Sequence, residues 1–90
     1  MPYQILQGIR AVEIATDIAG PFCGKLLSEY GAEVVKVEPR TGDPSRLRGP
    51  FPKDEPHPEK SALFLHLNAN KKSVALDLEQ PSDRELLRKL

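Results

Sequence analysis

The sequence lacks several features that would assign it to a common functional class. Its 90 residues include one cysteine, Cys23, no tryptophan, and only 6% aromatic residues. One cysteine excludes an internal disulfide framework and a cysteine-rich metal site, so we expect no bound metal and a cytoplasmic location. The 13 basic and 13 acidic side chains cancel, so the charge balance does not indicate a nucleic acid or an anionic membrane as partner. No long apolar run is present, and we expect no membrane span or secretory leader.

The glycine fingerprint of dinucleotide-binding proteins is also absent. Gly20 and Gly24 are four residues apart, and neither completes a Gly-x-Gly-x-x-Gly series. What the sequence does contain, between Gly8 and Glu38, is the pattern of a βαβ unit, with a strand, a turn, a helix and a second strand in succession. Glu38 ends the second strand, where such folds place a ribose-binding acid. Without the glycines, we interpret Glu38 as a solvated strand end.

The boundaries of this unit follow from local signals. Ile9 to Ala15 is apolar enough to form a buried parallel strand. Pro21 suits the first position of a helix, where its fixed φ is helical and its missing N–H is not needed. Gly31 suits the left-handed position just past the helix end. The predicted helix carries an apolar stripe that we expect to pack against the sheet, with Lys25, Ser28 and Glu29 facing water. The stripe consists of Phe22, Cys23, Leu26, Leu27 and Tyr30.

The second half of the chain completes an α/β fold. Residues 39–60 form a proline-rich loop, which we expect to be either functional or disordered. Residues 61–67 could form a helix turn or an edge strand, and we favour the helix because the apolar residues do not alternate strictly with polar ones. We also predict a third strand over 73–78 and a final helix that begins at Pro81, or one residue later with Ser82 and Glu85 as a capping box. The expected fold is a Rossmann-like parallel sheet segment, with three strands and two to three helices. It would be an incomplete part of a larger doubly wound domain, in which 1–90 form one segment.

Several side chains are candidates for chemistry, and each has a plainer alternative. The turn Asp17–Pro21 presents helix N-terminal amides that suit phosphate or carbonyl oxygens, but it also reads as an ordinary strand-to-helix turn. Cys23 fits packing better than nucleophilic attack, because the sequence places no base beside it. Asp17 and Asp77 could act as acid or base groups, but solvated roles explain both. Basic residues could contact phosphate or face water; they are Arg40, Arg46, Arg48, Lys71 and Lys72. His57 and His66 lack the spacing of metal ligands.

The chain as a whole resembles the N-terminal portion of the class III CoA-transferases. The resemblance rests on the ordered motifs AGPF, GAEVVKVE, GDPSR and NKKSVALDL, and it covers nearly all of the sequence. This is the family of formyl-CoA transferase, carnitine CoA-transferase and the alpha-methylacyl-CoA racemases. The resemblance implies a longer protein that forms an interlocked homodimer and moves coenzyme A between an acyl-CoA and a carboxylic acid. It also implies an aspartate nucleophile that lies beyond Leu90, so no catalytic residue is carried over to this chain.

Contact with coenzyme A is what the resemblance carries over to these residues. Asp17, Ile18 and Ala19 match the family's strand-to-helix turn for the coenzyme. An arginine often follows the glutamate that ends the second strand, but here Pro39 takes that place and Arg40 follows, so the contact is shifted by one residue or lost. Leu76 and Glu79 match positions that flank the nucleotide, although Glu79 stands where a basic residue would help to bind phosphate.

Three readings of the chain stay open at this point. The first is the CoA-binding part of a transferase, or of a racemase or isomerase of the same family. The second is a nucleotide-binding βαβ module without acyl transfer, which the absent glycine fingerprint argues against. The third is an inactive remnant that associates with a longer relative.

Overall fold

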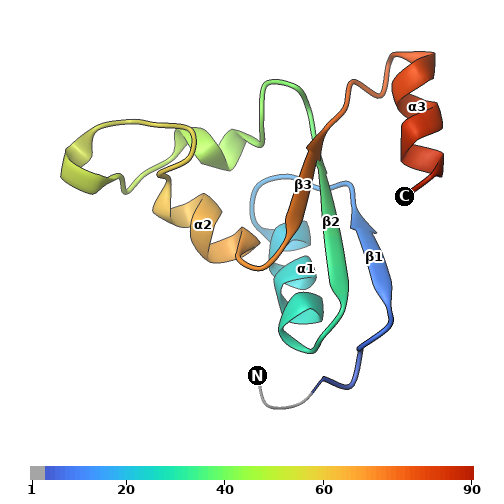
Figure 1. The fold of residues 1–90 in the computed structure, drawn as a ribbon. Coiled ribbons are helices and arrows are strands. Elements are labelled where there is room, and N and C mark those ends of the chain that lie inside the picture. The colour runs from blue at the N-terminus through green and yellow to red at the C-terminus, as the bar shows by residue number, and fades with distance from the viewer. Residues whose placement is uncertain (1–3) are drawn as a thin grey trace.

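The computed structural model describes residues 4–90, which form a three-stranded parallel sheet with helices (Figure 1). The strands lie in the order β1–β2–β3, so the α/β fold class predicted from the sequence is confirmed. In chain order, the elements are β1 Arg10–Glu13, α1 Ala19–Glu29, β2 Glu33–Glu38, the 3₁₀ helices η1 Pro44–Leu47 and η2 Pro52–Asp54, α2 Ala62–Asn68, β3 Lys72–Ala75 and α3 Pro81–Arg88. Within residues 4–90, no helix has the length and apolar character needed to cross a membrane.

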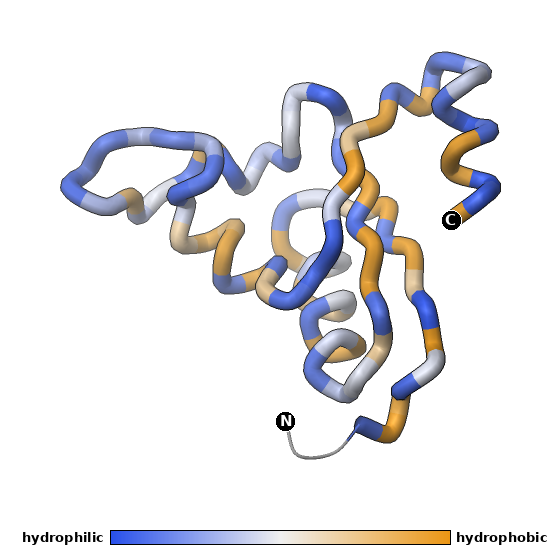
Figure 2. The backbone as a smooth tube through the Cα atoms, viewed as in Figure 1, coloured by the Kyte–Doolittle hydropathy of each residue, from blue (hydrophilic) through white to orange (hydrophobic). Residues whose placement is uncertain are grey.

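The central strand β2 forms the middle of the core. It is buried from Val34 to Glu38 and pairs with β1 on one side and β3 on the other. Phe64 and Leu67 of α2 are buried as well, at 8% and 4% exposure. Figure 2 shows apolar residues concentrated along β1 and β2, whereas the loop between η1 and α2 is mostly hydrophilic. The core is therefore narrow and centred on one strand.

The face of α1 that packs against the sheet is not the predicted one. Pro21, Gly24 and Ser28 are its buried residues, whereas Phe22 and Leu26 of the predicted stripe are 46% and 42% exposed. The reason is that the sheet carries charged residues on this side: a Cβ on Gly24 would lie 2.0 Å from Glu13 Oε1. Only a helix face of small residues can approach so closely. The rest of the predicted stripe is also not buried; its members are Cys23, Leu27 and Tyr30.

The start of α1 differs from the expected one because another residue caps this helix, whereas α3 begins at the first of its two expected positions. The helix α1 begins at Ala19, so Pro21 is its third residue rather than its first. The helix α2 is confirmed, with Ser61 Oγ accepting a hydrogen bond from the Phe64 amide at 3.2 Å. The helix α3 has Pro81 at its first position and Gln80 as its cap, so the capping box at Ser82 does not form.

The outer strands are shorter than predicted. The first strand covers Arg10–Glu13 rather than 9–15, and the third covers Lys72–Ala75 rather than 73–78. Beyond Ala75 the chain leaves the sheet, although the Leu76 amide still donates to Glu38 O at 2.9 Å. Residues that were expected to extend the strands, Ile14, Leu76 and Leu78, instead follow the strand ends.

Candidate functional site

A cleft of about 490 Å³ opens where the three parallel strands end. Parallel strands that run side by side bring their carboxyl ends to the same edge of the sheet, which is where ligands bind in open α/β folds. Apolar side chains supply much of its wall, together with a few polar groups, as in many small-molecule sites. The residues that line the cleft are Ile14, Ala15, Thr16, Val37, Glu38, Pro39, Arg40, Thr41, Leu76, Asp77, Leu78 and Glu79.

Four of the seven residues predicted to contact the coenzyme line this cleft. Pro39 and Arg40 come from the segment after β2, and Leu76 and Glu79 from the segment after β3. Leu76 is 4% exposed, whereas the side chain of Arg40 is 63% exposed. The structure therefore brings together residues that lie far apart in the sequence, with the arginine at the solvent side.

The other three predicted residues lie where the turn after β1 leads into α1, next to the cleft-lining Thr16, and Ala19 is the first residue of the helix. Asp17 has a positive φ of 71°, and its amide donates to Asp43 Oδ1 at 3.1 Å. The Asp17 carboxylate pairs with the Arg48 guanidinium at 2.9 Å. Ile18 is half exposed, and its carbonyl accepts from the Phe22 amide at 2.8 Å. Ala19 is exposed as well. The turn is held in place by the loop that follows β2, and it does not itself line the cleft.

Asp83 of α3 connects the two segments that provide the polar wall. Its Oδ2 accepts from Arg40 Nη2 at 2.7 Å and from the Asp77 amide at 2.7 Å. Asp83 itself is 4% exposed. The hydrogen bond from the Asp77 amide, together with that from Arg40, lowers the pKa of Asp83 from its ordinary 3.8. The carboxylate is thus charged at neutral pH and fixes both partners.

Comparison with known proteins shows which family the chain belongs to. The family model described as CoA-transferase family III matches residues 6–90. The chain belongs to CoA-transferase family III. This confirms the resemblance drawn from the four sequence motifs. The matched range includes every residue that lines the cleft.

Named relatives and a solved structure agree with this assignment. The chain is 37% identical over 86 residues to an (R)-2-hydroxy-4-methylpentanoate CoA-transferase of Clostridioides difficile, covering 96% of this chain and 22% of that protein. It is 41% identical over 88 residues to a succinate–glutarate CoA-transferase of Agrobacterium fabrum, covering 94% and 22%. The crystal structure of a CaiB/BaiF family protein from Brucella suis matches with a TM-score of 0.83 and 36% identity, covering 97% and 23%. The chain spans about a fifth of the length of these proteins.

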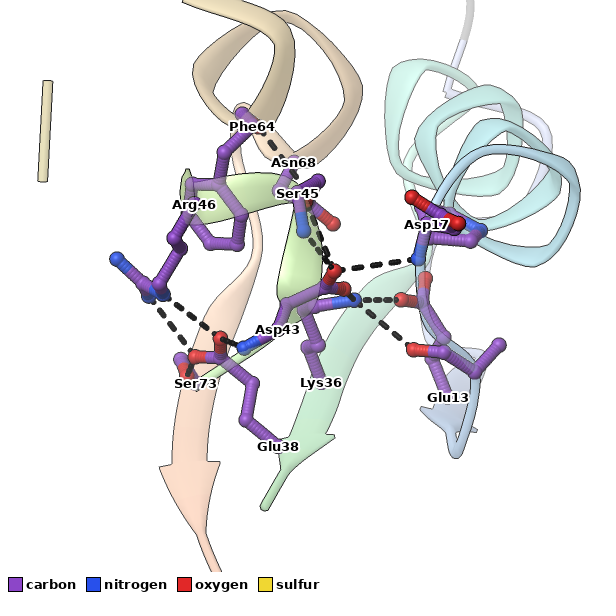
Figure 3. A network of polar contacts seen from close by, with 12 residues as sticks. Glu13, Asp17, Lys36, Glu38, Asp43, Ser45, Arg46, Phe64, Asn68 and Ser73 are labelled. Atoms are coloured by element: carbon purple, nitrogen blue, oxygen red, sulfur yellow. Dashed lines mark hydrogen bonds and ion pairs between the residues drawn. The ribbon is translucent and has the colours of Figure 1, made fainter. Parts of the chain in front are cut away.

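The family III chain also contains a buried charge network that the sequence reasoning missed (Figure 3). Lys36 is 1% exposed, and its Nζ lies 2.8 Å from Glu13 Oε2 and 2.8 Å from Asp43 Oδ2. Lys71 Nζ reaches Glu13 Oε1 at 2.7 Å and Asn68 Oδ1 at 2.7 Å. Two lysines and two carboxylates therefore balance one another beneath α1. The sequence signal that could have indicated this network is Lys36, which lies between Val35 and Val37 in a buried strand.

This network removes Lys71 from the candidates for phosphate contact. Its side chain is 1% exposed, and its Nζ also donates to Pro21 O at 2.8 Å. Burial lowers the pKa of Lys71, while the hydrogen bond with Glu13 opposes that shift. Lys72 remains exposed, with Glu33 3.7 Å away. The role of Lys71 is to hold α1 and the end of α2 against β1.

Glu38 was expected to be solvated, and this is wrong. It is 4% exposed and accepts from Arg46 Nε at 2.8 Å, Ser73 Oγ at 2.5 Å and the Asp43 amide at 2.9 Å. Burial alone would raise the pKa of Glu38, but these hydrogen bonds outweigh it and lower the pKa from 4.5 to about 2. Arg46 also lies over the Phe64 ring, 3.7 Å from its centroid. Arg46 is therefore engaged with Glu38 rather than open to phosphate.

Asp77, a candidate acid or base group, lines the cleft, whereas Cys23, His57 and His66 do not. Cys23 is exposed on α1. His66 faces Lys25 Nζ at 3.3 Å, and His57 Nδ1 accepts from the Glu59 amide at 3.1 Å. Residues 4–90 contain no group of three or more His, Cys, Asp or Glu side chains that could hold a metal ion. Of the candidate arginines, only Arg40 lines the cleft.

Proposed function

We propose that this chain binds coenzyme A in the cleft, as the N-terminal part of an acyl-CoA:carboxylate CoA-transferase. The observation that carries the proposal is the convergence of Pro39, Arg40, Leu76 and Glu79 on one cleft at the carboxyl edge of the sheet. All four match positions that the family resemblance assigns to contact with the coenzyme. The names of the relatives, which are CoA-transferases, support the same reading.

The chemistry of the cleft fits the nucleotide half of the coenzyme. Ile14, which is 57% exposed, and the half-buried Leu78 offer apolar surface against which an adenine ring can pack. Arg40 is the cationic group at the rim, and a guanidinium suits phosphate oxygens. The carboxylates of Asp77 and Glu79 can accept hydrogen bonds from ribose hydroxyls or the adenine amino group. The role of these residues is to bind and orient the coenzyme. The aspartate that attacks the thioester belongs to a different segment of the family sequence.

The proposal includes what the family resemblance implies for the working protein. Its substrates are an acyl-CoA and a carboxylic acid, and it acts as an interlocked homodimer in the cytoplasm. Two measurements on the protein purified from its source test this part of the proposal. They are its intact mass and its acyl-CoA:carboxylate exchange activity, taken on the same sample. A protein of this chain's mass, 10.0 kDa, without exchange activity would contradict the transferase assignment.

The binding site itself is tested with an arginine variant and a matched control. We expect R40Q to weaken CoA binding roughly 10-fold, because a charge-assisted hydrogen bond to phosphate is lost. R10Q removes an exposed arginine at the start of β1, at the end of the sheet opposite the cleft, where it pairs with Glu33 of β2. It should leave the affinity for CoA unchanged. Isothermal titration calorimetry measures both. Equal effects of the two substitutions, or displacement of CoA by NAD at similar concentration, would count against this site.

A further inference from the structure

Asp83 occupies a position from which it controls the geometry of the cleft without lining it. It lies in the first turn of α3 and is buried, yet both of its hydrogen-bond donors belong to cleft-lining residues. Arg40 comes from the segment after β2, and the Asp77 amide from the segment after β3. A single carboxylate therefore joins the two sides of the polar wall.

The position of α3 depends on this contact, because the helix has few others. In the described part of the chain, α3 packs against no other helix or strand, and Figure 1 shows it standing apart from α1 and α2. It is held through loops: Asp83 binds Arg40 and the Asp77 amide, and Arg84 donates to Leu78 O at 3.0 Å. The position of Arg40 is consequently tied to the position of α3.

We propose that Asp83 is a positioning residue that holds the Arg40 guanidinium at the mouth of the cleft, ready to receive a phosphate of the ligand. This inference rests on the proposed CoA site and adds the group that prepares it. Arg40 remains 63% exposed although it is bonded. A guanidinium has five N–H donors in a planar fork, so bonding to Asp83 through Nη2 leaves donors for a phosphate.

Two effects of Asp83 on phosphate binding oppose each other. Its negative charge repels a phosphate, whereas its hydrogen bond orders a long, exposed side chain before the ligand arrives. The Asp77 amide and the Arg40 guanidinium both donate to the same carboxylate oxygen, which offsets its charge. Ordering should therefore prevail, and loss of the carboxylate should weaken the binding of phosphate-bearing ligands.

The test compares ADP with adenosine, because only ADP presents phosphates to Arg40. The substitution D83N keeps an oxygen that can accept from the Asp77 amide but removes the charge that holds Arg40. We expect D83N to weaken ADP binding roughly 3- to 10-fold, the cost of ordering one long side chain on binding, and to leave adenosine binding unchanged. E85Q, on an exposed position of the same helix, is the control and should change neither. Isothermal titration calorimetry of the unaltered protein and of each variant measures the affinities for ADP and for adenosine.

A double-mutant cycle shows whether Asp83 acts through Arg40. In an R40Q background, D83N should have no further effect on ADP affinity. D83E, which keeps the charge but displaces it by one methylene, provides a second variant if D83N lowers the folded fraction. It should reduce the ratio of ADP to adenosine affinity in the same direction.

The possible outcomes separate this inference from the proposed function. If the unaltered protein binds neither ADP nor CoA, the proposed function fails, and the inference fails with it. If the unaltered protein binds ADP but D83N binds it equally or more tightly, only the inference is overturned. Equal weakening of ADP and adenosine, or an effect of D83N that persists in R40Q, would also overturn it, because Asp83 would then shape the cleft wall without acting through Arg40.

Discussion

At the scale of single residues, Lys36 is the group on which the buried charges depend. It lies between Glu13 and Asp43, each 2.8 Å from its Nζ. We predict that K36M destabilises the protein by about 3 kcal/mol, because removing one partner of a buried ion pair leaves an uncompensated charge. D43N should do the same from the other side. Urea denaturation monitored by circular dichroism measures both changes.

The double substitution K36M/D43N provides the control for that prediction. It removes one positive and one negative charge together, so the remaining pair of Glu13 and Lys71 stays balanced. The double variant should therefore be less destabilised than the sum of the single variants. Simple additivity would mean that Lys36 acts by packing alone rather than by charge.

The low pKa of Glu38 leads to a second prediction at this scale, which concerns acid stability. A carboxyl whose pKa is about 2 when folded and 4.5 when unfolded stabilises the fold above the unfolded value. That contribution is lost as the pH falls from about 4.5 to about 2, because the unfolded state binds the proton first. We predict that E38Q is less stable at pH 7 and has a flatter pH dependence in this window. Thermal melts of both proteins between pH 2 and 7 measure it, and parallel curves would contradict it.

At the scale of the element, α1 depends on its glycines for its approach to β1. A Cβ on Gly24 would lie 2.0 Å from Glu13 Oε1 and 3.2 Å from Lys71 Cε. We predict that G24A destabilises the fold by about 2 kcal/mol through overpacking, although alanine favours a helix by about 1 kcal/mol. C23A, on the exposed side of the same helix, should stay within about 0.5 kcal/mol of the unaltered protein. Stabilisation by G24A, read from the denaturation midpoint, would show that the helix can move away.

The same helix shows what sequence patterns could and could not predict. The order of strands and helices was predicted correctly, because turn residues such as Gly31 and prolines near the helix starts mark the boundaries. The buried face of α1 was not, since periodicity locates apolar residues but does not reveal that Glu13 and Lys36 lie on the sheet beneath it. Parallel topology and motif position indicated four of the residues that line the cleft, which are Pro39, Arg40, Leu76 and Glu79. Pairings such as Lys71 with Glu13, which are 58 residues apart, cannot be recognised from the neighbouring residues in the sequence.

At the scale of the whole molecule, a small core faces a large exposed apolar surface. Ile18, Phe22, Leu26 and Tyr30 follow one another at four-residue spacing along α1 and are 37% to 50% exposed. The buried hydrophobic residues of the described chain are few, and most belong to β2 and α2. A domain of this size buries only about 60% of its unfolded surface, and a contiguous exposed apolar stripe promotes association.

We therefore predict that the 90-residue chain, produced alone, is marginally stable and self-associates as its concentration rises. Light scattering after size-exclusion chromatography measures the association, and a melt followed by circular dichroism measures the stability. Replacing Phe22 and Leu26 by glutamate should reduce association without further loss of stability, because both side chains are more than 40% exposed. Association that persists in this variant would point to the unpaired strand edges of β1 and β3 as its cause. A sharp, cooperative melt of a monomer would contradict the prediction itself, because it would mean that β2 and its neighbours suffice as a core.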